Sequence, residues 1–210
     1  MQIKTVVVGM LQTNCYLLGD ETQKVCALID PGTAVDRILE AAESEGWRVT
    51  HILLTHGHFD HILAVSEIQK RTGAQLYISR KDEWLLDPAV ARHAAYVREP
   101  YTMPRVDGYL SEGMTLQVGS LTISVLETPG HTAGSVCLLC GNRMFSGDTL
   151  FCEDCGRTDL DTGSQEDMLR SLKKLALLPD DYSVYPGHEE ATTLSHERAA
   201  NYMMRESLRQ

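Results

Sequence analysis

The sequence lacks an excess of positive charge. Lys and Arg together number 19, whereas Asp and Glu number 29, so the formal net charge is −10 at pH 7. Proteins that bind the phosphate backbone of nucleic acids or an anionic membrane surface need basic patches. The composition therefore argues against nucleic acid and against membranes as partners.

Long apolar runs are also missing, and none approaches the roughly 20 residues of a membrane-spanning helix. The first residues, MQIKTVVVGMLQTN, hold a short apolar stretch without a small-residue cleavage site, so they predict a first strand and not a signal peptide. We therefore expect a cytoplasmic protein. In a reducing compartment its six cysteines are expected to be free thiols.

The chain has 210 residues, of which 43% are apolar and 23% are charged, as is usual for a globular protein. This length suffices for one large domain or two small ones. No internal repeat and no low-complexity tract divides it. The sequence predicts a single domain over residues 1–210.

Short runs of β-branched and aromatic residues between turn residues predict strands. They are Ile3–Val8, Cys15–Leu18, Val25–Ile29, Thr50–Leu54, Gln75–Ile78, Thr115–Val118, Leu121–Leu126, Ser135–Leu139, Arg143–Phe145 and Tyr182–Tyr185. Helical spacing predicts helices at Ala34–Glu45, Leu63–Arg71, Lys81–Leu86, Leu194–Glu206 and from a cap at Ser164 to Leu177. Residues Asp87–Arg105 predict a long surface loop with a short helix around Val90–Tyr96. The alternation predicts a layered α/β domain with sheets inside and helices outside.

Four potential metal ligands follow the buried strand that ends at Thr55, namely His56, His58, Asp60 and His61. Imidazole and carboxylate groups together suit zinc, iron or manganese. At an extended strand end His56 and His58 point to the same side, so one ion can take both. Asp60 and His61 would project from the first turn of a following helix. The spacing therefore predicts two adjacent metal positions.

Three further candidate ligands, His131, Asp148 and His188, each follow a predicted strand. Glycine precedes each of them and permits a tight turn that directs the side chain back over the strand ends. Loops on a rigid sheet are where sites are usually built. A single histidine is more often structural, which is our interpretation of His51, His93 and His196.

These seven residues in this order resemble the metallo-β-lactamase-fold hydrolases. The match extends over nearly the whole chain, from Thr13-Asn14-Cys15-Tyr16 and Asp30-Pro31-Gly32 to Pro186-Gly187-His188. The resemblance implies an αββα sandwich with a dinuclear site on one edge. It implies one metal ion held by His56, His58 and His131 and another by Asp60, His61 and His188, with Asp148 bridging the two.

The run from Ser146 to Phe151, followed by Gly156-Arg157-Thr158-Asp159-Leu160, looks most like the glyoxalase II-type thioesterases. Known members of that subgroup hydrolyse S-acyl glutathione. Only about 20 residues follow His188, so the chain resembles the short forms without the C-terminal glutathione-binding domain.

The resemblance implies a hydrolase that acts on a small-molecule thioester through a hydroxide bridging two divalent ions, most simply zinc, with iron or manganese as alternatives. Asp60 would orient the hydroxide, and Asp148 would set the spacing of the two ions. Arg157 could hold a substrate carboxylate or pair with a nearby aspartate. Further candidates could contact the ligands (Thr55, Thr132) or line the mouth of the site (Tyr96, Arg98, Tyr101).

Four cysteines form two C-x2-C pairs, Cys137 with Cys140 and Cys152 with Cys155, a pattern typical of structural zinc. However, Cys137 and Cys140 lie on a predicted strand, where residues three apart face opposite sides and cannot reach one ion. We therefore expect buried free thiols.

Other functions of this family remain open. A persulfide dioxygenase shares the H-x-H-x-D-H and C-G-R-T-D elements but uses a single iron and consumes oxygen, and a lactonase uses the same dinuclear chemistry. A true β-lactamase would lack the aspartate at position 148, and nucleases of this fold carry added RNA-binding elements. A diiron flavoprotein-type site would have glutamate at position 58. A non-catalytic binding module would have lost ligands, whereas all seven are present.

Overall fold

Two six-stranded sheets form the centre of the molecule. The computed structural model describes residues 1–91 and 101–209. The first sheet has its strands in chain order: β1 (Gln2–Val8), β2 (Thr13–Asp20), β3 (Val25–Ile29), β4 (Arg48–Leu53), β5 (Gln75–Ser79) and β6 (Gly108–Leu110). The second sheet contains β7 (Thr115–Val118), β8 (Leu121–Glu127), β9 (Val136–Cys140), β10 (Arg143–Gly147), β11 (Ser183–Pro186) and β12 (Thr192–Thr193).

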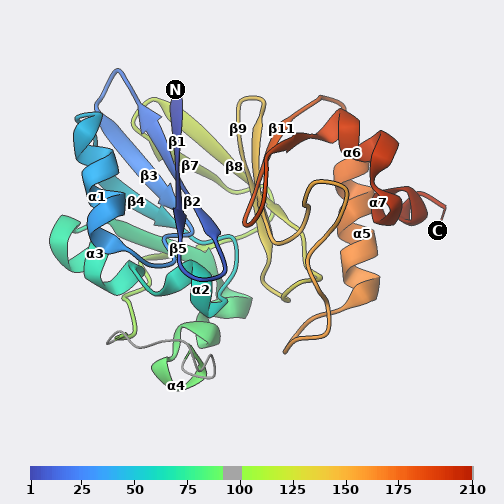
Figure 1. Cartoon of the computed structure of the whole chain (residues 1–210), viewed down its shortest axis with the longest axis horizontal. Coiled ribbons are helices and arrows are strands. Elements are labelled where there is room, and N and C mark those ends of the chain that lie inside the picture. Colours follow the sequence, from blue (N-terminus) through green and yellow to red (C-terminus); the bar gives the residue numbers. More distant parts are fainter. Residues whose placement is uncertain (92–100, 210) are drawn as a thin grey trace.

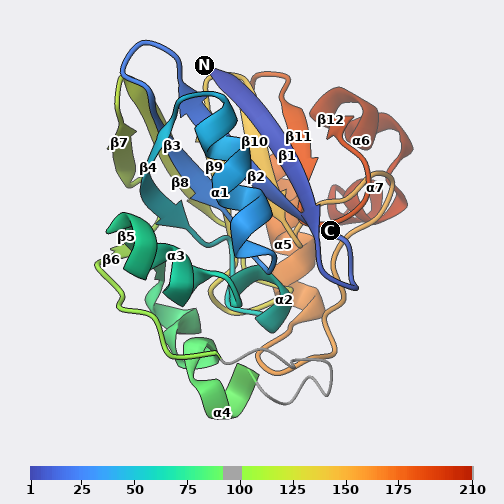
Figure 2. The same ribbon diagram turned by 60° about the vertical axis from the view of Figure 1, so that its left-hand side comes forward.

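Helices cover the outer face of each sheet (Figure 1). On the first sheet lie α1 (Val35–Ser44) and α3 (Val65–Thr72), and on the second lie α5 (Gln165–Ala176), α6 (Leu194–Ala200) and α7 (Tyr202–Ser207). The short α2 (Phe59–Ile62), the 3₁₀ helix η1 (Arg80–Leu86) and α4 (Pro88–Ala91) gather near one end of the sandwich (Figure 2). This arrangement confirms the expected αββα sandwich.

The core has three apolar layers because both faces of the central strands are buried. One layer packs α1 and α3 against the first sheet, and its members include Ile38, Leu28 and Ile52. A second fills the space between the sheets, and a third packs α5, α6 and α7 against the second sheet. Neighbouring strand residues alternate between layers, so Leu138 faces the first sheet and Cys137 faces the helices.

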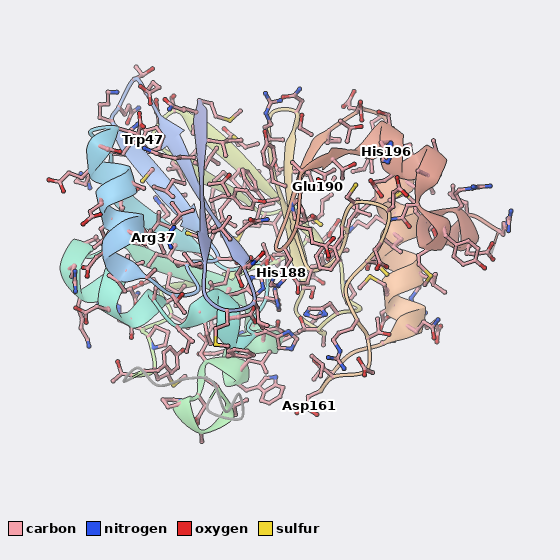
Figure 3. All side chains as sticks on the ribbon, viewed as in Figure 1. Arg37, Trp47, Asp161, His188, Glu190 and His196 are labelled. Carbon is pink, nitrogen blue, oxygen red and sulfur yellow. The ribbon has the colours of Figure 1, made fainter. Side chains whose placement is uncertain are left out.

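Strand direction brings the predicted ligands together. Strands β10 and β11 are parallel, and β8 runs in their direction because both β8 and β10 are antiparallel to β9. The loops after these three strands therefore meet at one edge of the second sheet. Backbone hydrogen bonds join that edge to the first sheet, from Val136 N to Thr55 O (2.9 Å) and from Asn14 N to Gly187 O (2.7 Å). Figure 3 places His188 centrally at this edge and His196 on the outer flank.

Most predicted elements are confirmed, but some differ. The helix expected at Lys81–Leu86 is the 3₁₀ helix η1, and the closing helix is split at Asn201, whose side chain caps α7. The short strands β6 and β12 were not predicted. Of the helix expected around Val90–Tyr96, α4 ends at Ala91 and the rest, with His93, lies outside the described residues. In the described part of the chain, no helix is both long and apolar enough to cross a membrane.

Candidate metal centre

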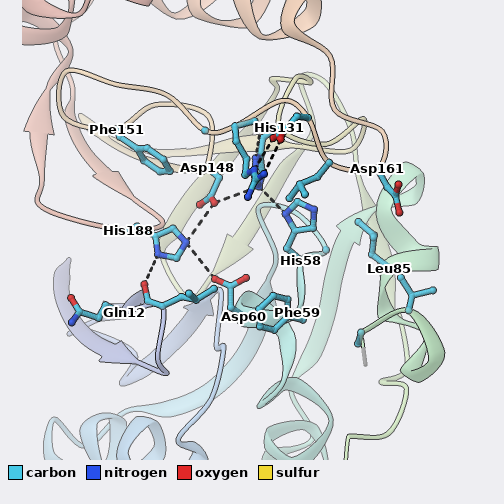
Figure 4. Close-up of a pocket in the computed structure, with 18 of the residues that line it drawn as sticks. Gln12, His58, Phe59, Asp60, Leu85, His131, Asp148, Phe151, Asp161 and His188 are labelled. Atoms are coloured by element: carbon cyan, nitrogen blue, oxygen red, sulfur yellow. Dashed lines mark hydrogen bonds and ion pairs between the residues drawn. The ribbon is translucent and has the colours of Figure 1, made fainter. Parts of the chain in front are cut away.

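The seven predicted ligands converge at one edge of the sandwich, where Figure 4 shows several of them facing one another. His56, His58 and His131 have their ligand atoms within 4.8 Å of one another, and we call them the three-histidine group. Asp60, His61 and His188 meet the same criterion, and we call them the carboxylate group. Segments more than 120 residues apart in sequence therefore contribute to one site.

Asp148 lies between the two groups. Its Oδ2 is 3.4 Å from Nε2 of His131, on the side of the three-histidine group. Its Oδ1 is 3.5 Å from Nε2 of His61, and its Oδ2 is 3.5 Å from Nε2 of His188, both in the carboxylate group. One carboxylate thus faces ligands of both groups, which is the position a bridging ligand occupies.

Several atoms at the centre are buried without a hydrogen-bond partner among the described residues. They are Nε2 of His56, Nε2 of His61 and Oδ1 of Asp148. An unpaired buried polar atom costs free energy, and native proteins usually satisfy such atoms by hydrogen bonds or metal coordination. In addition, Nδ1 of His58 and Nε2 of His131 lie only 2.7 Å apart, so both ring nitrogens are close enough to bind one ion. The donor set and its orphaned atoms fit divalent metal ions.

Backbone carbonyls orient two of the histidines. Nδ1 of His131 lies 2.7 Å from the carbonyl oxygen of Arg157, and Nδ1 of His188 lies 3.0 Å from that of Leu11. A carbonyl can only accept, so each Nδ1 must carry the hydrogen. In the neutral ring, Nε2 then keeps the lone pair that a metal needs, and this nitrogen faces the centre.

Asp30 orients the ligands of the first sheet and was not predicted as a site residue. Its carboxylate lies 3.0 Å from Nδ1 of His61 and accepts hydrogen bonds from the backbone N–H (2.8 Å) and hydroxyl (2.6 Å) of Thr55. The Thr55 oxygen, having donated its hydrogen, lies 3.1 Å from Nδ1 of His56, which confirms the expected contact. Asp30 directly follows a strand, as the ligands do, and this position was the available signal.

Asp82 connects the two ligand loops and was also missed. This fully buried carboxylate accepts hydrogen bonds from the backbone N–H groups of Gly57 (3.1 Å) and Gly134 (2.8 Å) and from the hydroxyl of Thr132 (2.7 Å). Gly57 lies between His56 and His58, so Asp82 joins their turn to the His131 loop. Thr132 therefore contacts Asp82 and not, as expected, a metal ligand. A lone aspartate in η1 gives no sequence signal for this role.

The two groups differ in electrostatics. Burial and neighbouring imidazoles lower the pKa of His56 well below its ordinary value, and they lower that of His58 to about 4. Burial also acts to lower the pKa of His61 and His188, but the nearby carboxylates outweigh it and raise these values to about 9 and about 10. Burial opposes ionisation of Asp60, yet His61, His188 and Thr13 hold its pKa below the ordinary range.

A pocket of about 940 Å³ opens over the centre. Its walls include the apolar side chains of Leu11, Phe59, Leu85, Phe151 and Leu160, and carboxylates at its rim include Asp159, Asp161 and Glu189.

The predicted substrate residue Arg157 also lines the pocket, and its guanidinium pairs with Asp159 (2.7 and 2.8 Å), as the alternative interpretation held. Tyr101 is buried and donates to the carbonyl of Leu86, so it does not line the mouth. Tyr96 and Arg98 lie outside the described residues.

The cysteines do not form a four-thiolate site. Cys137 belongs to the layer between the second sheet and its helices, whereas Cys140 belongs to the layer between the sheets, as the strand argument predicts. All six cysteines are free. Cys152 and Cys155 are only partly buried, which corrects the expectation that all four are buried. His51 is structural and stacks on Tyr77, with ring centroids 5.9 Å apart.

Among curated proteins, the chain is 30% identical to the hydroxyacylglutathione hydrolase GloC of Haemophilus influenzae over 210 residues. The alignment covers 96% of this chain and 97% of GloC. GloC is therefore a relative of nearly the same length.

Several solved structures also match this chain over nearly its full length. The BLEG-1 B3 metallo-β-lactamase matches with a TM-score of 0.89 and 34% identity, covering 97% of this chain and 99% of that one. A di-iron-bound form of TTHA1623 matches with a TM-score of 0.83 and 35% identity over 95% of this chain and 98% of its own. ETHE1 from Myxococcus xanthus matches with a TM-score of 0.80 and 33% identity over 96% of this chain and 84% of its own.

The family model of the metallo-β-lactamase superfamily matches residues 8–188, which include every predicted ligand. With its two facing sheets, its outer helices and its His/Asp clusters at one edge, the chain belongs to the metallo-β-lactamase superfamily.

Proposed function

We propose that the protein hydrolyses small thioesters of the hydroxyacylglutathione class with two divalent metal ions, zinc in the first instance. The observation that carries the proposal is the position of Asp148, whose carboxylate faces His131 on one side and His61 and His188 on the other. The similarity to GloC over nearly the full length of both chains supports the substrate class.

In this proposal the three-histidine group would hold one ion and the carboxylate group the other, and Asp148 would serve both. Two ions held there would lower the pKa of a water molecule, supply hydroxide near neutral pH and polarise the carbonyl group of the substrate. The residues of this chain perform the remaining tasks. No serine or cysteine nucleophile is required, and the described cysteines lie outside the pocket lining.

Asp60 is our candidate for orienting the attacking water. Its Oδ2 accepts a hydrogen bond from Thr13 (2.8 Å) and lies 3.3 Å from Nε2 of His188, and these contacts hold the carboxylate in place in the lining of the pocket. Its lowered pKa keeps it ionised and able to accept a hydrogen bond from water.

The walls of the pocket suit a small acyl group. Phe59 and Phe151 line it, and the ring of Phe151 lies 6.1 Å from that of His188. Apolar walls exclude bulk water and strengthen electrostatic interactions inside the site. Arg157 remains our candidate for a carboxylate of the thiol carrier, which would have to compete with Asp159 for the guanidinium.

The test is hydrolysis of S-lactoylglutathione by the purified protein, before and after removal of metal with a chelator and after return of zinc. We expect loss on chelation and recovery with zinc. Parallel assays with thioesters of other thiols, an acyl-lactone panel and a chromogenic β-lactam separate the alternatives, the β-lactam because of the similarity to BLEG-1. Hydrolysis of a lactone or β-lactam but of no thioester would contradict the proposal.

A second candidate is persulfide dioxygenation, which the similarity to ETHE1 favours. That reaction uses a single iron and consumes oxygen. An oxygen electrode with glutathione persulfide and the iron-loaded protein distinguishes it from hydrolysis, which leaves the oxygen concentration unchanged.

A further inference from the structure

A second cluster of potential metal ligands lies outside the metal centre described above. Cys152 from the loop after β10, and His196 and Glu197 from α6, place a sulfur, a ring nitrogen and a carboxylate oxygen within 4.8 Å of one another. Figure 3 labels His196 on the outer flank of the molecule, away from His188. The cluster shares no residue with the three-histidine group or the carboxylate group.

Glu197 is the buried member of this cluster, with none of its surface exposed. Its carboxylate accepts hydrogen bonds from the Thr192 hydroxyl (2.6 Å), the Glu153 backbone N–H (2.9 Å) and the Asn201 amide (2.9 Å). None of these donors carries a charge. A carboxylate offers about four lone-pair positions, so Oε1, which receives the Thr192 hydrogen bond, has another for a cation. Buried charges are usually paired or bound to metals.

The surroundings of the cluster are rich in carboxylates. Oε1 of Glu153 lies 3.0 Å from Nε2 of His196. Partial burial, followed by the charge of Glu197 and those of Glu190 and Glu153, raises the pKa of the Cys152 thiol above its ordinary value. At neutral pH this thiol is therefore protonated and a poor nucleophile. The same negative field attracts a divalent cation, which would displace the thiol proton.

The donor types select the ion. A thiolate, an imidazole and carboxylates form a mixed set of the kind that zinc binds in tetrahedral sites. We propose that Cys152, His196 and Glu197, with Glu153 as the fourth ligand, bind a zinc ion separate from the main metal centre.

The position of this ion gives it a structural role. It would join α6 to the loop that carries Phe151, and Phe151 forms part of the pocket wall next to His188. The polar contacts already between these segments, from Glu197 to the Glu153 backbone and from Asn201 to the carbonyl of Asp154 (3.0 Å), would be reinforced.

Cys155 provides a matched control. It lies three residues from Cys152 but packs against the apolar layer under α5 and does not belong to the cluster. If any nearby thiol could bind the ion, Cys155 would serve as well as Cys152.

The experiment uses the full-length protein saturated with Co²⁺ in place of zinc. The main centre contains only histidine and aspartate, so a thiolate-to-cobalt charge-transfer band in the near ultraviolet reports on the proposed site alone. We expect the band in the wild type and in Cys155→Ser, and its loss in Cys152→Ser. We also expect Cys152→Ser to bind one zinc ion fewer while keeping the ions of the main centre.

Two further variants, His196→Ala and Glu153→Gln, test the site without disturbing the fold, because these side chains are 46% and 61% exposed. We expect each to weaken binding of the additional ion by about tenfold or more, as measured by competition with a chromophoric chelator. The absence of the band from the wild type, its survival in Cys152→Ser, or unchanged affinity in both exposed variants would overturn the proposal.

Discussion

The three-histidine group consists of imidazoles alone, whereas the carboxylate group combines two imidazoles with Asp60. This difference determines whether the histidine rings of each group are protonated near neutral pH. The pKa of His56 and of His58 is lowered, so both rings are neutral and ready to bind a metal near neutral pH. The pKa of His61 and of His188 is raised by Asp60 and Asp148, so both rings hold protons in the absence of metal. The three-histidine group therefore binds its ion without displacing protons from His56 and His58. The carboxylate group must first release the additional protons of His61 and His188.

The largest effect is expected from removing the carboxylate of Asp148, which faces both the three-histidine group and the carboxylate group. Asp148→Ala should lower kcat/KM for thioester hydrolysis by about 10³-fold or more, because the electrostatic stabilisation of the transition state is lost. It should also reduce metal retention in both halves, and His131→Ala should do so mainly in the three-histidine half. Asp161→Asn, at the rim of the same pocket, is the control. Wild-type turnover in Asp148→Ala would contradict the assignment.

The pH dependence of metal binding should differ between the halves. His61 and His188, with pKa values of about 9 and about 10, must lose their protons before they bind metal. Affinity of the carboxylate half should therefore fall as pH falls, by up to about 100-fold per pH unit where two protons are displaced. His58, with a pKa of about 4, is uncharged throughout the neutral range.

Calorimetric titration of metal into the metal-free protein, in buffers of different ionisation enthalpy, measures this proton release. We expect the ion of the carboxylate half to release more protons than the ion of the three-histidine half. Equal release from both binding steps would show that the two halves do not differ as described.

Two single substitutions, one beside each group of ligands, should weaken metal binding in one group and not in the other. Asp82→Asn changes the buried carboxylate that joins the His56–His58 turn to the His131 loop, and it should weaken metal binding in the three-histidine half. Thr13→Val removes the hydroxyl that donates to Asp60 and should weaken the carboxylate half. Each change is expected to cost about tenfold in affinity, as for other residues that orient metal ligands. Competition with a chelator measures both, and the reverse pattern would refute the assignment.

The smallest effect is expected from Arg157→Ala. The Arg157 and Asp159 side chains are 62% and 67% exposed, and ion pairs as exposed as this one contribute little to stability because water screens them. The backbone carbonyl that accepts from His131 is retained. Thermal unfolding should be nearly unchanged, and KM for S-lactoylglutathione should rise only a few-fold if the guanidinium binds the substrate. A loss of kcat as large as that of Asp148→Ala would give Arg157 a role beyond binding.

The sequence predicted the strands and the convergence of the ligands because both have local signals. Buried strands are short apolar runs between turns, and each ligand lies in the segment that follows such a run. Asp82 has no such signal, because its importance depends on Gly57 and Gly134, which lie in loops that belong to different sheets. The helical pattern continues through Asn201, and the break there depends on contacts with Glu197 and Asp154. Strand β6 has only three residues, too few for a periodic pattern.

The most direct test of the account is metal content measured together with activity. The metal-free protein would be titrated with zinc, with the bound ions assigned to the main centre in the Cys152→Ser background, and thioester hydrolysis would be followed at each step. We predict that activity reaches its maximum only when the main centre holds two ions. Full hydrolytic activity with a single ion would contradict the dinuclear centre.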